Sequence, residues 1–140
     1  MATAGGGQQR NLAVARPTFR KHERLRGRVR IQELVTTGRS VHEPPFKLIG
    51  KAMSLPTVAP MQVAFAVPRR HLKLAVHRNR VKRLMREAWR LDKERWYVPL
   101  RERGVQVACL IVCQGAVKLT LAEVRMKISR AMDRWLERHG

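Results

Sequence analysis

The chain has 140 residues, of which 44% are apolar, enough for one domain with a single modest core. Its net charge of +20 and its pI of about 11.8 indicate a polyanionic partner: RNA, DNA or an anionic membrane. A membrane is the weakest candidate, because no stretch approaches the roughly 20 apolar residues that span a bilayer. The Gly/Ala-rich start, Met1 to Gln9, also lacks the apolar segment of a secretory signal. We therefore expect a cytoplasmic protein with neither a membrane nor a small molecule as its partner.

The N-terminal part divides into an extension and the start of a domain. Residues 1–15 show little periodicity and are predicted to be disordered, and residues 16–140 are predicted to form the domain. Basic residues are dense from Arg16 to Arg30, and a helix that ends at Thr37-Gly38 is predicted to follow. The apolar stripe of this helix consists of Leu25, Val29, Ile31, Leu34 and Val35.

Two strands are predicted next. Pro44-Pro45 precedes the first, Phe46 to Met53, and Pro56 and Pro60 bracket a loop before the second, Gln62 to Val67. The apolar run of the second strand is nearly continuous, which is typical of a strand covered on both faces.

The segment from Arg69 to Arg90 holds nine Lys or Arg residues and a single acid, Glu87. From about Ala75 its pattern is helical, with an apolar stripe on one side and two cationic rows on the other. The apolar stripe is Val81, Leu84, Met85 and Ala88. The other rows hold Asn79, Lys82, Arg83, Arg86 and Arg90.

Like charges four residues apart destabilise an isolated helix by about 0.2–0.5 kcal/mol per pair. An ordinary solvated face mixes charges of both signs, and this face does not, so we interpret it as a surface whose charges are neutralised by phosphates. Asn79 is either a helix cap, a polar residue facing water, or a donor to a phosphate or a 2′-hydroxyl.

The C-terminal part is predicted to hold a polar turn, a central strand and a helix. Arg101 to Gly104 is the turn and Val105 to Val112 the strand. Cys109 and Cys113 would face the same side of an extended segment, and we interpret them as buried small apolar residues, since no further zinc ligands lie nearby.

The last helix has the clearest pattern. Thr120 and Glu123 form a capping box at its start. Its apolar stripe is Leu121, Val124, Ile128, Met132, Trp135 and Leu136. The whole order predicts an α/β (α+β) sandwich with a single mixed sheet of about four strands and three helices.

The sequence contains no constellation for protein-based catalysis. The ten acids are scattered, with only Asp92 and Glu94 close together, and the five histidines are dispersed among polar or basic neighbours. We therefore predict no catalytic and no metal-binding residue in the polypeptide.

The run from Ala75 to Glu87 resembles the signature of the bacterial ribonuclease P protein component, A-V-x-R-N-x-x-K-R-x-x-R-E, and meets every specified position. The basic pair Arg69-Arg70 precedes it, as in the family. The resemblance covers roughly residues 17–138. Its further matches upstream are Arg24-Leu25, Gly38-Arg39-Ser40 and Pro45-Phe46.

The resemblance implies an α/β sandwich with a left-handed βαβ crossover, similar to one domain of a ribosomal protein. It implies a protein subunit that binds the catalytic ribonuclease P RNA and the 5′ leader of precursor tRNA. The complex, a ribonucleoprotein endonuclease, would remove the leader to give the mature tRNA 5′ end. The RNA would carry the chemistry. The protein alone would bind no cofactor, and magnesium is expected in the RNA–protein complex.

The resemblance also assigns two groups of site residues. The expected contacts to the catalytic RNA are Arg69, Arg70, Lys73, Arg78, Asn79, Arg80, Lys82, Arg83, Arg86 and Arg90. The expected leader cleft, between the first helix and the sheet, consists of Arg24, Arg28, Ile31, Val35, Phe46 and Ile49.

The chain departs from the family in its cleft, where members often carry aromatic residues. Ile31, Val35 and Ile49 occupy such positions here, and only Phe46 keeps a ring. Leader binding is therefore expected to depend more on shape and charge, because each stacked base contributes about 1–3 kcal/mol where a ring is present.

Two other interpretations fit the composition. One is a ribosomal or other structural RNA-binding protein, which would be equally small and basic. The other is a DNA-binding protein that lays its basic helix in a major groove, which is weakened because Arg and Lys leave few residue types to read bases.

Overall fold

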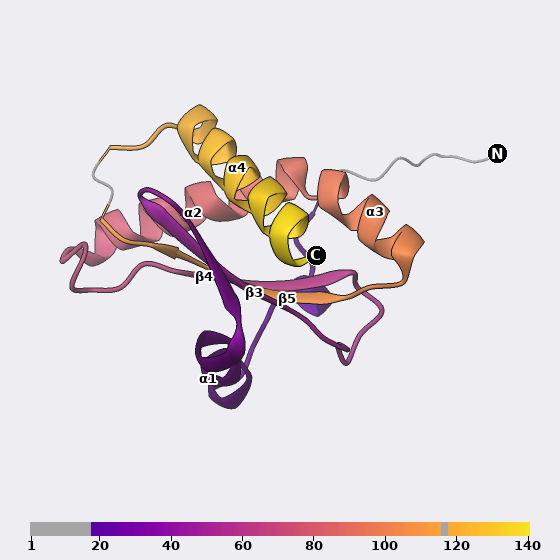
Figure 1. Cartoon of the computed structure of the whole chain (residues 1–140). Helices are drawn as coiled ribbons and strands as arrows, with labels where there is room; N and C mark the ends of the chain where they lie inside the picture. The colour runs from indigo at the N-terminus through magenta and orange to yellow at the C-terminus, as the bar shows by residue number, and fades with distance from the viewer. Residues whose placement is uncertain (1–17, 116–117) are drawn as a thin grey trace.

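The computed structural model describes residues 18–115 and 118–140 (Figure 1). The predicted extension, residues 1–15, lies outside the described residues. The elements are, in chain order, the 3-10 turn η2 (Lys21–Glu23), α1 (Arg28–Thr37), β2 (Arg39–Glu43), β3 (Phe46–Ala52), β4 (Met61–Ala66), α2 (Ala75–Asp92), α3 (Glu94–Arg103), β5 (Val107–Cys113) and α4 (Leu121–His139).

The four strands form a single mixed sheet in the order β2-β3-β5-β4. β3 is antiparallel to both β2 and β5, whereas β4 is parallel to β5. The connection between these parallel strands runs through α2 and α3. The predicted fold class is confirmed, and the predicted central strand, β5, lies between β3 and β4.

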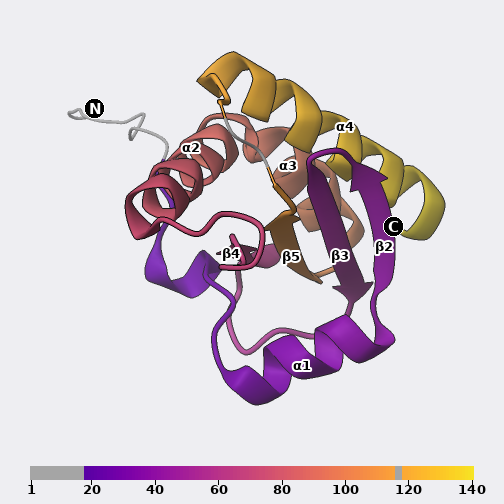
Figure 2. The ribbon, with the colours of Figure 1, turned by 90° about the vertical axis from the view of Figure 1, so that its left-hand side faces the viewer.

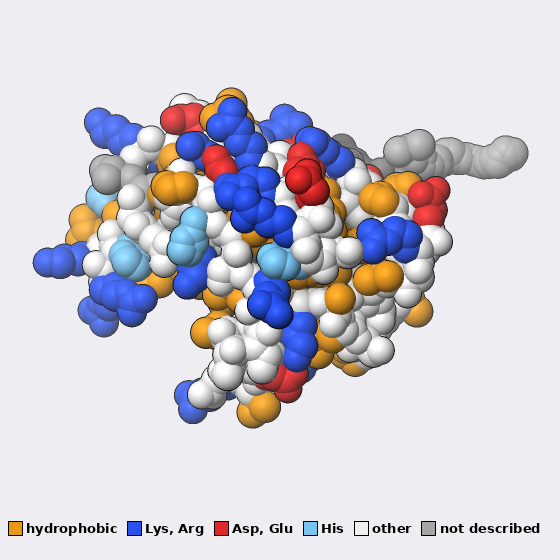
Figure 3. All heavy atoms as spheres, viewed as in Figure 1, with side chains coloured by type: hydrophobic (Ala, Val, Ile, Leu, Met, Phe, Trp, Pro, Cys, Tyr) orange, Lys and Arg blue, Asp and Glu red, His pale blue; other side chains and the backbone are white. Residues whose placement is uncertain are grey.

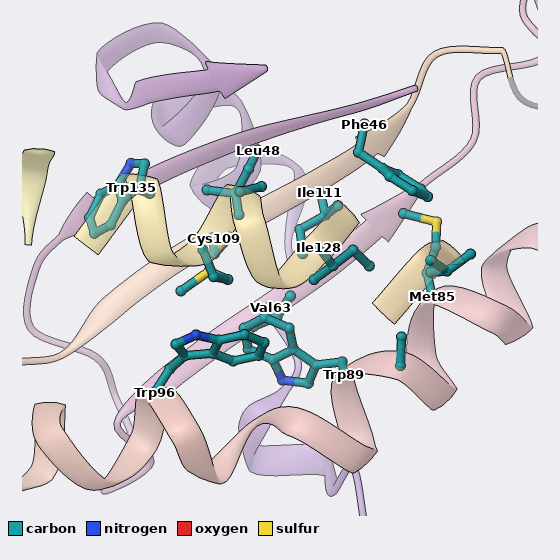
Figure 4. Close-up of a cluster of buried hydrophobic side chains, with 14 of the residues drawn as sticks. Phe46, Leu48, Val63, Met85, Trp89, Trp96, Cys109, Ile111, Ile128 and Trp135 are labelled. Carbon is teal, nitrogen blue, oxygen red and sulfur yellow. The ribbon is translucent and has the colours of Figure 1, made fainter. Parts of the chain in front are cut away.

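Strand alternation gives the sheet two unequal apolar faces. The larger face packs against α2, α3 and α4 around Leu48, Val63 and Ile111, and this main core includes Trp89 and Trp96 (Figure 4). The other face carries a smaller cluster beneath α1, which crosses the sheet on its own (Figure 2). The fold therefore leaves one face of the sheet only partly covered.

The described residues contain four α-helices rather than the three predicted. α3 was missed because Trp96, Tyr97 and Leu100, which it buries, lie among charged residues and a proline, Pro99. The segment that forms β2 was not predicted to be a strand, because only Val41 is buried among its five residues. Of the predicted turn from Arg101 to Gly104, only Gly104 is confirmed; it ends α3 with a φ of 67°.

The predicted apolar stripe of the first helix is partly wrong. Val29 and Val35 are 77% and 52% exposed, and Leu25 is buried but precedes the helix. α1 begins only after Gly27, whose φ of 96° favours glycine. Leu34 alone is fully buried in α1.

Two local predictions from the C-terminal part are confirmed. The Thr120 side chain accepts a hydrogen bond from the Glu123 amide at 3.2 Å, and a Glu123 carboxylate oxygen accepts one from the Thr120 amide at 3.0 Å. Cys109 and Cys113 form no disulfide and are fully buried in the main core. Burial raises the pKa of the Cys109 thiol.

Both edges of the sheet are covered. At β2, the Trp135 indole donates a hydrogen bond to the Arg39 carbonyl at 3.0 Å, and the Arg134 guanidinium donates one to the His42 carbonyl at 2.9 Å. At β4, the chain after η2 forms a parallel bridge, in which the Leu25 amide donates to the Val63 carbonyl at 3.0 Å.

A buried ion pair attaches the N-terminal segment to the corner between α2 and α3. The Lys93 ammonium donates to a Glu23 carboxylate oxygen at 2.6 Å, and the Tyr97 hydroxyl donates to the same oxygen at 2.9 Å. Glu23 is 3% exposed and Lys93 8%. Burial alone would raise the pKa of the Glu23 carboxyl, but hydrogen bonds from Lys93, the Arg20 amide and Tyr97, together with the Lys93 charge, lower it.

We expect Glu23→Gln to lower the free energy of unfolding at neutral pH by about 3–5 kcal/mol, because Lys93 would remain buried without its charged partner. The wild type holds the pKa of Glu23 below its unfolded value of about 4.3. The Glu23 carboxylate therefore makes its full contribution to the free energy of unfolding above that pKa, and the contribution is lost as the pH falls. Thermal denaturation followed by circular dichroism from about pH 7 to about pH 3 measures both effects.

The control is Glu33→Gln, which removes an exposed carboxylate from α1. The loss of stability in acid should be shallower in Glu23→Gln than in the wild type, and unchanged in Glu33→Gln. The same acid dependence in all three proteins would contradict a stabilising role for this ion pair.

Candidate nucleic-acid interface

α2 has the two faces that its sequence predicts. Val81, Met85 and Ala88 are fully buried in the main core, and Leu84 packs against it in part. Trp89 extends the buried stripe beyond the predicted residues. The cationic rows therefore point away from the core, because a helix that buries one stripe exposes the opposite one.

The exposed side of α2 carries Asn79, Arg80, Arg83 and Arg86, with Lys82 half-buried beside them. Asn79 lies in the second turn of the helix, whose N-cap is Leu74, so it is not a helix cap. The two remaining interpretations of Asn79 are a solvated polar residue and an RNA contact.

Arg78 joins the preceding loop to α2. Its guanidinium donates to the Leu72 carbonyl at 2.9 Å and to the Lys73 carbonyl at 2.6 Å. These bonds hold the loop across the first turn of the helix, so Arg78 positions the loop cations as well as adding its own charge.

The loop before α2 presents Arg69, Arg70 and Lys73 to solvent. It turns back at Pro68, whose carbonyl accepts a hydrogen bond from the His71 amide at 3.0 Å. Figure 3 shows Lys and Arg side chains gathered at the left-hand end of the molecule, around this loop and the start of α2. The structure thus brings the loop and helix residues of the predicted RNA contact together. We call this the basic surface; its members are Arg69, Arg70, Lys73, Arg78, Asn79, Lys82, Arg83 and Arg86.

Arg80 and Arg90, two further predicted RNA contacts, also have partners within the chain. Arg80 donates to the Leu119 carbonyl at 3.0 Å, which fixes the segment before α4. Arg90 donates from Nε to Glu87 at 2.9 Å and forms an ion pair with it. The hydrogen bond from Arg90 lowers the pKa of the Glu87 carboxyl. The Glu87 carboxylate offsets the charge of Arg90, whereas Arg80 keeps its full charge because its partner is a neutral carbonyl.

Only some of the residues predicted for the leader cleft lie together beside α1. Phe46 lies on the other side of the sheet: the residue is 1% exposed, and its ring points into the main core, on the face opposite α1 (Figure 4). Ile49 is on the correct face but buried beneath α1 with Leu34, so it forms the floor and offers little surface. Strand alternation separates the two residues, since positions an odd number apart face opposite sides.

The remaining cleft residues lie around α1. Ile31 is half-buried at the edge of the smaller cluster, and Val35 is exposed. Arg24 and Arg28 are exposed at the approach to the helix, and the Arg24 guanidinium donates to the Phe19 carbonyl at 3.2 Å.

Sequence reasoning missed a group of cations on this side. A pocket of about 450 Å³ is lined by four Lys or Arg side chains from η2, the following segment and α1, together with His22, Thr57 and Gln62. The four cations are Lys21, Arg24, Arg26 and Arg30. Their signal in the sequence is the dense basic run from Arg16 to Arg30, of which only Arg24 and Arg28 were assigned to the cleft.

In the described part of the chain, every helix is too short or too polar to cross a bilayer. Within the same residues, no three His, Cys, Asp or Glu side chains are grouped closely enough to hold a metal ion.

Comparison with known proteins gives a consistent result. The family model described as Ribonuclease P matches residues 19–136. The chain is 34% identical over 125 residues to the ribonuclease P protein component of Chlorobium phaeobacteroides, covering 82% of this chain and 86% of that one. It is 36% identical over 91 residues to that of Porphyromonas gingivalis, covering 64% and 66%.

Solved structures share the fold. The ribonuclease P protein of Staphylococcus aureus superposes with a TM-score of 0.65 at 17% identity, covering 81% of this chain and 95% of that one. The protein from Thermotoga maritima gives a TM-score of 0.61 at 20% identity, covering 80% and 96%. With a family model that spans most of the chain and relatives above 30% identity, this chain belongs to the ribonuclease P protein family.

Proposed function

We propose that the chain binds the catalytic RNA of ribonuclease P through the basic surface and the 5′ leader of precursor tRNA in the cleft beside α1. The observation that carries this proposal is the exposed cationic side of α2, joined to the loop of Arg69, Arg70 and Lys73. In this proposal the RNA performs the magnesium-dependent cleavage that removes the leader, and the protein positions the substrate.

The chemistry of the basic surface suits an RNA backbone. Arg83 and Arg86 are exposed, and a guanidinium can hold a phosphate through two parallel hydrogen bonds. The repulsion among neighbouring cations falls when phosphates bind and counterions are released, which favours association.

The two predicted surfaces lie on different parts of the fold, which supports two RNA contacts. The basic surface belongs to α2 and its preceding loop, whereas the cleft lies on the sheet face beneath α1. One protein could therefore contact the catalytic RNA and the leader at the same time.

Reconstitution tests this function against the alternative of a purely structural RNA-binding protein. The chain is mixed with a bacterial ribonuclease P RNA at low magnesium, and cleavage of precursor tRNA is measured. We expect the chain to stimulate removal of the leader. RNA binding without any stimulation would favour the structural alternative.

The basic surface can be tested through the salt dependence of RNA binding. We expect Arg83→Ala and Arg86→Ala each to weaken binding to ribonuclease P RNA and to reduce the slope of log K against log salt by about 0.7–0.9 for each phosphate that the side chain no longer neutralises. Filter binding over a range of salt concentrations measures the slope. Arg125→Ala, which removes an α4 cation bonded to Asp92, should leave the slope unchanged. Equal slopes for the wild type and both α2 variants would place the RNA surface elsewhere.

The cleft can be tested with two tRNA forms. We expect Ile31→Ala and Val35→Ala to reduce the affinity of the reconstituted complex for precursor tRNA more than for mature tRNA, because only the former has a leader. Val29→Ala is the matched control, since Val29 lies on α1 but is 77% exposed, away from the sheet. Equal losses of affinity for the two tRNA forms would argue against a leader cleft at α1.

A further inference from the structure

Only two aromatic rings of this chain are available to a ligand. The sequence has three Phe, three Trp and one Tyr, and all of them lie among the described residues. Phe19 and Phe65 are partly exposed. The other five are buried: Phe46, Trp89, Trp96, Tyr97 and Trp135.

Both available rings line one pocket. This pocket, of about 270 Å³, lies where β4, the segment after η2 and α2 meet, and Arg24, Arg26 and Arg86 also line it. The two ring centroids are 5.6 Å apart, at an interplanar angle of 63°. Of seven aromatic side chains dispersed through the sequence, the two that reach the surface therefore lie together among three arginines.

Each of the two rings contacts a neighbouring side chain that holds it in place. Phe65 meets the edge of Trp89 at a centroid distance of 6.3 Å, which anchors it to the main core. The Arg24 guanidinium lies 5.5 Å from the Phe19 centroid. Both rings are thus oriented before any ligand arrives, which reduces the entropy cost of binding.

The arginines come from both proposed RNA surfaces. Arg86 belongs to the basic surface on α2, whereas Arg24 and Arg26 belong to the cationic segment that approaches α1. The bridge between this segment and β4 at Val63 holds the two sides together. The pocket is consequently the junction between the basic surface and the cleft.

We infer that this pocket binds one unpaired RNA nucleotide. Its base lies against Phe19 and Phe65, and the phosphates on either side of it lie at Arg26 and Arg86. Aromatic rings beside cations are the usual device for unpaired bases, whereas a duplex hides its base faces. The inference rests on the proposed RNA-binding function and adds a site to it. The nucleotide could come from the leader or from ribonuclease P RNA.

The site also accounts for the departure of this chain from its family. The cleft positions that often carry rings hold Ile31, Val35 and Ile49, and Phe46 is turned into the core. The available rings lie instead at the outer edge of β4, so base stacking would take place there.

The test compares three substitutions of the same kind. Phe19→Leu and Phe65→Leu remove the available rings, whereas Phe46→Leu removes a buried ring and serves as the control. Three affinities are measured: that of the full chain for ribonuclease P RNA, and those of the reconstituted complex for precursor tRNA and for mature tRNA. Thermal denaturation establishes that each variant is folded at the assay temperature.

We expect Phe19→Leu and Phe65→Leu to weaken one of these affinities by about five- to tenfold, and Phe46→Leu to weaken none. A weakening confined to precursor tRNA assigns the nucleotide to the leader, and a weakening of the affinity for ribonuclease P RNA assigns it to that RNA. Unchanged affinities for both folded variants would overturn the inference. If the wild type bound neither RNA, the proposed function itself would fail.

A second variant reports stacking directly and does not depend on the stability of Phe65→Leu. In Phe19→Trp the new indole would be the only partly exposed one, since Trp89, Trp96 and Trp135 are buried. We expect its fluorescence to be quenched when RNA binds, with affinity at the wild-type level or tighter. Binding without quenching would overturn the inference.

Discussion

The ion pair between Glu23 and Lys93 fixes the relation between the two cationic parts of this protein. Lys93 lies at the corner between α2 and α3, and Glu23 ends η2, so the pair holds the N-terminal segment against the end of the basic helix. The following residues then run along β4, which places Arg24 and Arg26 opposite Arg86. This anchor opposes the repulsion that would otherwise drive these neighbouring like charges apart.

The amphipathic helix was predictable and the cleft was not, for a physical reason. α2 repeats its pattern over five turns, so its buried stripe and its cationic rows follow from local spacing alone. β3 is covered on both faces, and therefore Phe46 and Ile49 look equally buried in sequence although they face opposite sides. Strand alternation puts them on opposite faces, but only the position of α1 shows which of the two faces is beside the cleft.

Several arginines serve the fold and the surface together. Arg78 and Arg80 each donate to backbone carbonyls of other segments while remaining at or near the surface, and Arg90 is paired with Glu87. The sequence could not show the partner of Arg80, because Leu119 lies 39 residues away and is brought close only by the complete fold. The partners of Arg78 and Arg90 are local, within six residues of each side chain. A count of cations therefore overestimates the number of guanidinium hydrogen-bond donors that are free to meet a phosphate.

The covered sheet edges have a consequence for how the protein exists before it meets RNA. Exposed edge strands pair readily with strands of other molecules, which leads to domain swapping and aggregation. Here Trp135 and Arg134 occupy carbonyls of β2, and the segment at Leu25 occupies β4. Backbone groups at both ends of the sheet are thus already bonded within the chain, which makes strand pairing between copies less favourable, and the net charge of +20 opposes it further. At the sheet edges, recognition of a partner by the free protein therefore depends more on side chains than on unpaired backbone groups.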